Sequence, residues 1–506
     1  MRTSTAVDEP SRALNGQTMR GLMWMGFSTV VQSVLQVVVL SMLARLLTPS
    51  DFGMVAAAMV TIALANTLAV IGIGPAVIQR AVLTEHHIRT AFTLSVLLGM
   101  TFCALMWFGA PLIETLFRMT GLMPVMRVLG LVFLVHGFSV VAESLLSRQL
   151  RFRAIARIEL LSFVVGQGVV AVPLAIMGWS YWALVAAILV QTLITTSASV
   201  MITRHPCRPS LNLVALRELA ILGAGFSMAR MSNYVAVQGD NFVVGRLLGA
   251  QALGLYSRAY QLMALPASLY GKVADKVVFP AMAQVQDHPL RLAAAYRRGV
   301  GLTALIFMPL GTVIVVLAPE LVYILLGPQW TDLLTPFRIL AVGMYFRFGY
   351  KVSMSLLRSK GRVYQHAYLQ SIYAVLVCAG AWLACPYGLA AVSMAVVAAL
   401  TVHFFLMTMS SLYLLHLTWR DFVQAHLHGT ILSIAIGVVL WGGAEILRAY
   451  THPFVTCLIA GALVAIGLLT ASRYAPGWFF GQQGMWLIGT LSHYAARWMK
   501  PSLHKA

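Results

Sequence analysis

Basic side chains occur inside apolar segments of this chain, where a charge is costly. Arg347, Lys351 and Arg358 follow one another at i, i+4 and i+11 within the apolar segment 334–357 and its end. A helix turns by about 100° per residue, so this spacing puts all three cations on one face. Because a guanidinium fork bonds two oxygens of a phosphate at once, the face predicts a site for an anion such as a phosphate or diphosphate.

Two further apolar segments carry cations of the same kind. In 253–280, Arg258, Lys272 and Lys276 share one helix face, and Asp275 neutralises part of it. In 219–244, Arg230 lies about 16 Å from the start of the helix, near mid-membrane. We therefore predict a cationic, substrate-binding cavity formed by Arg230, Lys272, Lys276, Arg347, Lys351 and Arg358.

Polar residues accompany the cations on the first helix of each half. These are Gln32 and Gln36 in 21–44, and Asn233 and Asp240 in 219–244. They either line a hydrated cavity, with a role in ion coupling, or make hydrogen bonds between helices. Arg45 and Arg246 end these two helices. They either snorkel to the membrane interface or form a cationic pair at the outer mouth.

Composition places the chain in a membrane. Of its 506 residues, 60% are hydrophobic and 10% are charged, and the mean hydropathy is +0.84. Ordinary soluble domains carry about 25% charged residues, and no soluble fold could bury this much apolar surface. The net charge of +20 comes from basic residues in short linkers between apolar runs. This is the positive-inside pattern, and it argues against nucleic acid as a partner.

The apolar runs predict an all-α polytopic membrane protein. A span needs about 20 apolar residues. About fourteen segments satisfy this, at 21–44, 53–78, 91–116, 124–146, 156–177, 180–202, 219–244, 253–280, 299–326, 334–357, 364–386, 388–415, 428–447 and 453–472. His136 and His403 lie within them, and we expect packed histidines there rather than a proton relay.

A short repeat relates the two halves of the chain. ARLLTPSDFG ends at Gly53 and GRLLGAQALG ends at Gly254. They share an arginine, two leucines and a glycine at a common offset (246 − 45 = 201), namely Arg45/Arg246, Leu46/Leu247, Leu47/Leu248 and Gly53/Gly254. Six predicted spans separate the copies, so both enter the membrane from the same side. The chain is therefore predicted to hold two six-helix lobes in a parallel repeat plus two extra helices, an arrangement typical of alternating-access transporters.

The charge pattern assigns each segment to a side of the membrane. It predicts both ends of the chain inside a bacterial inner membrane, because the linkers that would be periplasmic are nearly free of positive charge. The predicted organisation is a cytoplasmic N-terminal segment (1–20), an N-lobe (21–202), a cytoplasmic linker (203–218), a C-lobe (219–415), helices 13 and 14 (416–472) and a basic amphipathic cytoplasmic tail (473–506). In the tail, Leu487, Leu491, Tyr494 and Trp498 favour an interfacial helix.

Four stretches resemble a known family. LARLLTPSDFGMVAAAMV, GIGPAVIQR, DNFVVGRLLGAQALGLYSRAYQLMALP and VVFPAMAQVQDHPLRLAAAYRR are similar to oligosaccharide flippases of the polysaccharide transporter family (Wzx-like). That family belongs to the multidrug/oligosaccharidyl-lipid/polysaccharide exporter superfamily, which also holds multidrug antiporters and the lipid II flippase. The similarity runs from about Gly21 to Leu415, and its most specific part is 240–298.

The resemblance implies a V-shaped, two-lobed fold with a central cationic cavity. It implies translocation of an undecaprenyl-diphosphate-linked oligosaccharide from the cytoplasmic to the periplasmic leaflet. It also implies coupling to a proton or sodium gradient and two partners: a polysaccharide polymerase and a chain-length regulator. The polymer is a capsule, an exopolysaccharide or the O-antigen of a lipopolysaccharide, and we favour a secreted exopolysaccharide. We expect no other cofactor and no metal.

Two other classes of function fit the sequence less well. A multidrug or cation antiporter of the same fold should place acids in its cavity, whereas this chain places bases there. A membrane enzyme that builds glycans needs a sizeable external domain, but no linker here exceeds roughly 20 residues. The sequence also lacks Walker, GxSxG, HExxH and CxxC motifs. We therefore expect a transporter and not an enzyme.

Overall fold

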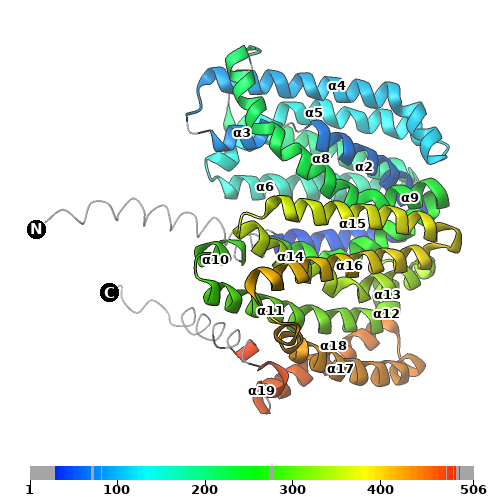
Figure 1. Cartoon of the computed structure of the whole chain (residues 1–506). Helices are drawn as coiled ribbons and strands as arrows, with labels where there is room; N and C mark the ends of the chain where they lie inside the picture. The colour runs from blue at the N-terminus through cyan, green and yellow to red at the C-terminus, as the bar shows by residue number, and fades with distance from the viewer. Residues whose placement is uncertain are drawn as a thin grey trace, which may run out of the picture. The chain divides into compact units, whose positions relative to one another are not determined.

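The chain folds into helices (Figure 1). The structure is a computed structural model that describes residues 29–69, 73–80, 82–204, 206, 208–273, 278–474, 476–481, 484, 485 and 489. Within these ranges, the side chains of 69, 213–230, 232, 267–273 and 476 are not described. In the described part every regular element is a helix, which confirms the predicted all-α fold class. The predicted interfacial residues of the tail lie outside the described residues.

The first half of the chain forms helices of very different lengths. They are Thr29–Leu46, α2 (Pro49–Ala69), α3 (Ile73–Gln79), α4 (Glu85–Phe117), α5 (Leu122–Arg148), α6 (Phe152–Phe163), η1 (Val164–Ala171), α7 (Val172–Ile176), α8 (Tyr181–Thr203) and α9 (Leu213–Val273). The sequence α6–η1–α7 makes one continuous span in which η1 is a π-helix. Pro173 lies two residues after the end of η1, and its missing N–H accounts for the local departure from α geometry.

The second half contains more breaks. Its helices are α10 (Phe279–Gln284), α11 (Pro289–Val316), α12 (Ala318–Leu325), η3 (Pro328–Leu333), α13 (Leu334–Val342), α14 (Met344–Ser359), α15 (Val363–Ala384), η4 (Cys385–Tyr387), α16 (Leu389–Leu415), α17 (Trp419–Tyr450), α18 (Pro453–Tyr474) and α19 (Pro476–Phe479). The segment 334–357, expected as one span, is thus divided at Gly343 into α13 and α14.

Eleven helices of the described chain are long and apolar enough to cross a membrane. They overlap eleven of the fourteen predicted spans, although the helix expected at 299–326 lies ten residues earlier, at Pro289–Val316. The described residues of the three others, 219–244, 253–280 and 334–357, lie in helices of the structure. The segment 334–357 is divided between α13 and α14, helices of 9 and 16 residues, each shorter than a span of about 20 residues. The chain is a multi-pass membrane protein, and the count of fourteen stays a prediction.

Packing within the chain defines two compact units. Unit 1 is Met1–Ser257 with Leu325–Gln329, and unit 2 is Arg258–Ile324 with Trp330–Ala506. This division follows contacts and does not test the predicted six-helix lobes, whose boundaries remain a prediction.

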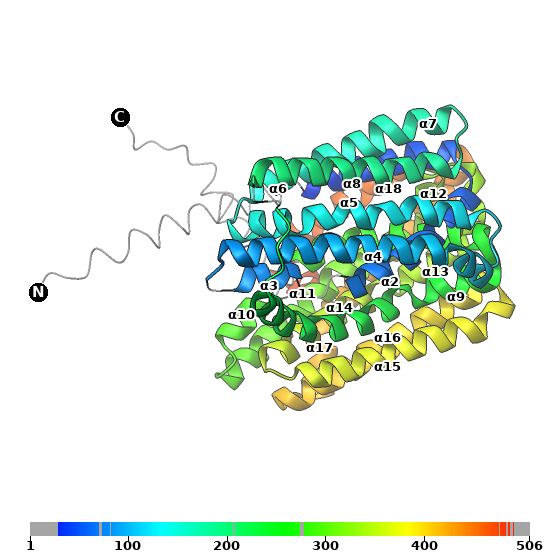
Figure 2. The ribbon, with the colours of Figure 1, turned by 90° about the horizontal axis from the view of Figure 1, so that it is seen from above.

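In unit 1, α4 and α5 lie side by side in both views (Figures 1 and 2). A Cβ on Gly99 or Gly137 would come closer than 3.0 Å to a main-chain oxygen of the facing helix. Small residues of this kind let membrane helices approach closely. Beside them, Ile73, Val77, Phe92 and other buried side chains form a hydrophobic cluster between α3, α4 and α5.

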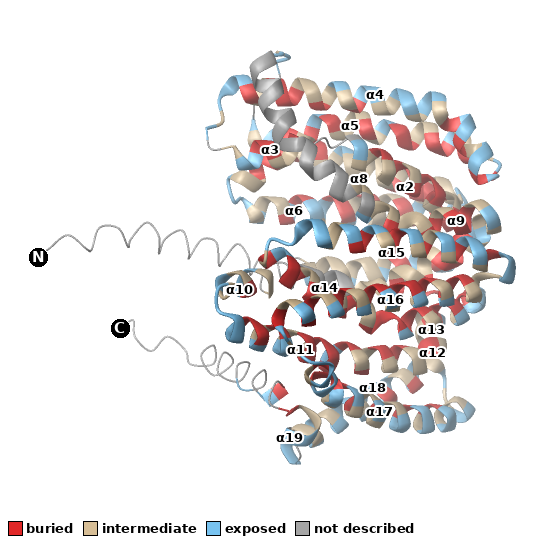
Figure 3. Cartoon of the chain, viewed as in Figure 1, coloured by how far each residue is buried: buried red, intermediate tan, exposed pale blue. Residues whose placement is uncertain are grey.

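In unit 2, α11 packs on α17, and α14 packs on α16. Gly429 of α17 meets the main chain of Ala304 in α11, again at a distance that no Cβ would allow. Figure 3 shows buried residues along the inner faces of α11 and α16 and exposed residues on outer helices such as α17. Large apolar side chains are exposed there, including Val438 and Trp441. A soluble protein does not expose such surface, whereas lipid covers it without cost.

Candidate functional site

The cations of α14 each lie beside an aromatic ring. The guanidinium carbon of Arg347 is 4.5 Å from the centre of the Tyr260 ring, and that of Arg358 is 4.8 Å from the centre of the Phe279 ring. The Lys351 ammonium is 6.0 Å from the Phe348 ring. Such contacts are worth about 0.5–2 kcal/mol, increasing as water is removed. They orient the cations on a face about 16 Å long without neutralising their charge.

The buried face of α14 holds this helix in a fixed rotation. Phe348 stacks on Phe307 of α11 with ring centres 3.8 Å apart. The Tyr345 hydroxyl is hydrogen-bonded to Nε2 of His426 in α17. The Ser353 hydroxyl lies 3.0 Å from the Tyr296 hydroxyl of α11. Because these buried contacts are on one side, the side chains of Arg347 and Lys351 are only half-buried and that of Arg358 is exposed.

The other members of the predicted cationic cavity cannot be placed beside α14. Arg230 and Lys272 belong to α9, but their side chains are not described, and Lys276 lies outside the described residues. Arg258, at the start of unit 2, donates a hydrogen bond to Oε1 of Gln261. The cavity as a whole therefore remains a prediction, and its described part is the cationic face of α14.

The two arginines of the repeat have different surroundings. Nη1 of Arg246 donates to the carbonyl of Thr115, 3.3 Å away, at the end of α4. Arg45 is exposed, at the end of the helix Thr29–Leu46. Beside Arg45, the Gln329 amide donates to the carbonyls of Ala44 and Leu47. Both arginines thus lie at helix C-termini, where the dipole favours a cation. Their pairing at an outer mouth remains a prediction.

The predicted polar residues also differ from one another. Asp240 is 2% exposed and accepts hydrogen bonds from the Tyr256 hydroxyl and the Asn241 main chain, each at 2.8 Å. This geometry matches the expected alternative of hydrogen bonding between helical segments. Asn233 is exposed, and Gln32 and Gln36 are half-buried. Their role in ion coupling remains a prediction.

In the repeat, the glycine of each copy lies against the main chain of the other copy. A Cβ on Gly53 would come closer than 3.0 Å to the main chain of Ala250, and a Cβ on Gly254 would do so with the main chain of Pro49. Ala250 is the position equivalent to Pro49 at the offset of 201 (250 − 49). The contact is therefore symmetric: each copy presents its glycine to the same carbonyl position of the other. We call these four residues the glycine crossing.

The turns that precede the glycine crossing are built differently. In the first copy, Thr48 caps α2: its N–H and hydroxyl donate to Asp51, and its hydroxyl accepts from the Asp51 N–H. Asp51 also accepts from the Ser180 hydroxyl. In the second copy, α9 turns at Gly249, where φ is 84° and ψ is −175°. That region of backbone space is essentially restricted to glycine.

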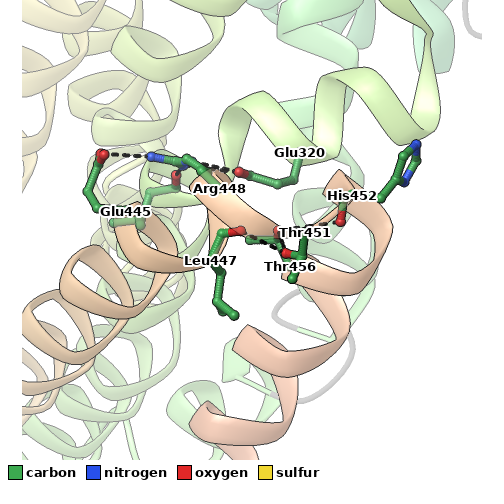
Figure 4. Close-up of polar contacts among 8 residues, drawn as sticks. Glu320, Glu445, Leu447, Arg448, Thr451, His452 and Thr456 are labelled. Carbon is green, nitrogen blue, oxygen red and sulfur yellow. Dashed lines mark hydrogen bonds and ion pairs between the residues drawn. The ribbon is translucent and has the colours of Figure 1, made fainter.

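A buried ion pair, which the sequence reading missed, joins α17 to α12. Glu320 is 3% exposed and receives two hydrogen bonds from Arg448, Nε to Oε1 at 2.7 Å and Nη2 to Oε2 at 3.1 Å. Figure 4 shows Arg448 also reaching Glu445, at 3.0 Å. The sequence did contain a signal for this ion pair: Glu320 lies inside the apolar run 299–326, where an acid requires a basic partner.

The sequence of this chain matches a known protein family. The family described as polysaccharide biosynthesis protein matches residues 42–335, more than half of the chain. The chain belongs to this family. The resemblance seen in the sequence is thereby confirmed.

Individual relatives match across most of the chain. The teichuronic acid biosynthesis protein TuaB of Bacillus subtilis (strain 168) is 24% identical over 85% of this chain and 89% of its own. The lipopolysaccharide biosynthesis protein WzxC of Escherichia coli (strain K12) is 26% identical over 69% of this chain and 72% of its own. The succinoglycan biosynthesis transport protein ExoT of Rhizobium meliloti (strain 1021) is 26% identical over 63% and 64%.

Solved structures show the same fold. The lipid II flippase MurJ in an inward closed conformation aligns with a TM-score of 0.72 at 11% identity, over 89% of this chain and 99% of MurJ. An inward-facing multidrug resistance MATE family transporter of the MOP superfamily aligns with a TM-score of 0.61 at 18% identity, over 77% of this chain and 98% of that one. The predicted all-α polytopic fold class is therefore confirmed.

Proposed function

We propose that this chain is a flippase that moves undecaprenyl-diphosphate-linked oligosaccharide repeat units from the cytoplasmic to the periplasmic leaflet. It serves the synthesis of a polysaccharide, with a secreted exopolysaccharide as our preferred product. It works by alternating access in the bacterial inner membrane with both ends inside, and it carries out no covalent chemistry.

The observation that carries this proposal is the cationic face of α14. Arg347, Lys351 and Arg358 are held on one side of a helix that their own packing keeps from rotating. Three bases along one face of a helix in a membrane protein favour an anionic substrate. A diphosphate supplies two phosphoryl groups, which suits guanidinium groups arranged along a helix. A cation antiporter would instead require acids on such a face.

The names of the relatives support recognition of a lipid-linked anion that their substrates share, rather than of a shared sugar. TuaB, WzxC and ExoT are named for teichuronic acid, lipopolysaccharide and succinoglycan biosynthesis. These polymers differ in their sugars, so a common recognition element should bind the lipid-linked anion. We extend the proposal to coupling with an ion gradient and to a polymerase and a chain-length regulator as partners in the same membrane.

The test uses a strain that lacks this chain. Restoring the wild-type chain should move completed lipid-linked repeat units to the periplasmic leaflet, measured with a membrane-impermeant glycan label on spheroplasts. Arg347→Gln should reduce this labelling by about 10–100-fold, the loss expected when a charge-assisted hydrogen bond of 1.5–3 kcal/mol is removed. Arg347→Lys should recover part of it, because lysine keeps the charge but not the fork.

The matched control is Arg420→Gln, which removes an exposed arginine from the start of α17 in the same unit. It should label like the wild type. The proposal fails if the sidedness of the lipid-linked pool is the same with and without the chain. A rise in drug sensitivity in that case would assign the chain to the antiporters.

A further inference from the structure

A histidine and a glutamate lie together on α5 in unit 1. His136 and Glu143 are seven residues apart, which places them on one helix face. Nε2 of His136 is 3.9 Å from Oε2 of Glu143, and their side chains are 37% and 40% exposed. The sequence favoured a packed histidine at this position. The structure instead gives His136 an acidic neighbour.

One oxygen of Glu143 has no hydrogen bond from the described residues. Its Oε1 atom is shielded from solvent and has no donor there. Other acids of unit 1 have close partners: Glu114 accepts from the Met123 N–H at 2.5 Å, and Glu85 pairs with Arg89 at 2.5 Å. A carboxylate oxygen that is shielded from water and lacks such donors is expensive to keep charged. Among the described acids of unit 1, Glu143 is therefore a candidate to take up a proton.

A small cavity adjoins the histidine. It has a volume of about 30 Å³, and its lining includes Asn66 of α2, Ser95 of α4 and His136 itself. This is room enough for a water molecule with polar partners. A proton could therefore reach the imidazole through water rather than through packed hydrocarbon.

In the described part of the chain, the helices that pack on α5 are α2, α3, α4, α6 and α8. Residues of α2, α3 and α4 line the cavity beside His136. Neither α3 nor α8 carries an acid or a base. The titratable groups of the others and of α5 are Asp51, Glu85, His86, His87, Arg89, Cys103, Glu114, Arg127, Arg148, Arg153, Arg157 and Glu159, with Tyr181 at the start of α8.

The nearest of these bases along α5 is already engaged. Arg148 follows Glu143 by five residues, and its Nη1 donates to the carbonyls of Val77 and Arg80 at 2.8 and 2.6 Å. Among the described residues, the ion-pair contact of Glu143 is with His136. The charge on this face is therefore set by the protonation of these two side chains.

We propose that His136 and Glu143 form a proton-binding site. With one proton the pair is neutral overall, either as imidazolium with carboxylate or as imidazole with carboxylic acid. After the proton leaves to water, the pair carries a charge of −1. A neutral pair can be enclosed by apolar helices, whereas the charged pair requires water. The proton thus favours the conformations in which this face is shut off.

The proton-binding site itself does not depend on the proposed flippase function. Only the transport step that the proton drives rests on that function. The site itself is tested by infrared difference spectroscopy of the purified full-length protein between an acidic and a neutral buffer. A carboxyl signal should differ between the two buffers in the wild type, disappear in Glu143→Gln and shift in His136→Gln. The control Glu85→Gln, an exposed acid of the same unit, should keep it. The same signal in Glu143→Gln as in the wild type would overturn the assignment.

A transport measurement distinguishes the proposed proton site from the proposed flippase function. In proteoliposomes with lipid-linked oligosaccharide, an imposed pH gradient should change the wild-type translocation rate. The ratio of rates with and without the gradient should fall to about one in Glu143→Gln and stay at the wild-type value in Glu85→Gln. A gradient response retained by Glu143→Gln contradicts the proton site and leaves the flippase intact. A wild-type protein that moves no lipid in either condition contradicts the flippase, while the infrared result still decides the proton site.

Discussion

The two copies of the repeat reach the same contact by different local chemistry. Both place a glycine, Gly53 or Gly254, against the main chain of the other copy. The first copy interrupts its helix and restarts it with the Thr48–Asp51 cap. The second copy has no such cap and turns at Gly249 through a positive φ. The close approach is thus common to both copies, whereas the turn that leads to it is not.

This difference teaches that the glycine crossing constrains the sequence more tightly than the turn does. A turn has several solutions, because a side-chain cap and a glycine backbone each satisfy it. Where two main chains are in contact, only glycine fits, because every other residue adds an atom where the carbonyl of the other copy lies. Substitutions in the two copies should therefore fall into an order of severity.

The largest effect is expected at the crossing itself. Gly53→Ala and Gly254→Ala should each destabilise the protein by about 1–3 kcal/mol or more, since the added carbon forces two helices apart. The two losses should be equal within error because the contact is symmetric. Unfolding of the purified protein in detergent measures both. Gly109→Ala is the control, as a Cβ there meets nothing within 4 Å. A harmless Gly254→Ala would break the symmetry of the comparison.

A smaller loss is expected at the turn of the second copy. Gly249 has no atom within 4 Å of an added Cβ, so alanine there creates no clash. Its cost is the backbone strain alone, about 1–3 kcal/mol and below the loss at Gly254. The same unfolding measurement tests this order. A larger loss at Gly249 than at Gly254 would mean that the turn, rather than the crossing, limits the second copy.

The smallest loss is expected at the turn of the first copy. Thr48→Val removes the hydroxyl that caps α2 and should cost about 1 kcal/mol. Thr101→Val is a matched control, since the Thr101 hydroxyl bonds a carbonyl inside α4 and caps nothing. Both variants should keep the crossing, as shown by unchanged translocation in the spheroplast assay. Loss of translocation in Thr48→Val alone would show that the cap positions Gly53.

The parts of the fold that depend on local patterns were predictable. Continuous apolar runs fix where a helix must lie in lipid, and eleven spans follow them. The break at Gly343 was missed, since one glycine in an apolar run does not reveal which helices pack on either side of it. The π-helical turn before Pro173 was missed for the same reason.

The candidate site was predictable in its residue types but not in its contacts. Helical spacing alone put Arg347, Lys351 and Arg358 on one face. The rings of Tyr260 and Phe279 that orient two of them come from other helices, and no local pattern connects them. The repeat revealed that Gly53 and Gly254 are equivalent, but not that they meet. Pairings between distant segments depend on tertiary packing, which the period of a single helix does not encode.

The ion pair between Glu320 and Arg448 has a consequence for how the protein is made. Glu320 enters the membrane with α12, well before the ribosome reaches Arg448 at the end of α17. Until then the buried acid lacks its base, and a chain that stops after α16 never acquires it. A lone charge in such a place is strongly unfavourable. The helix α17 is therefore required to complete the protein, and quality-control proteases should remove a chain truncated at Leu415.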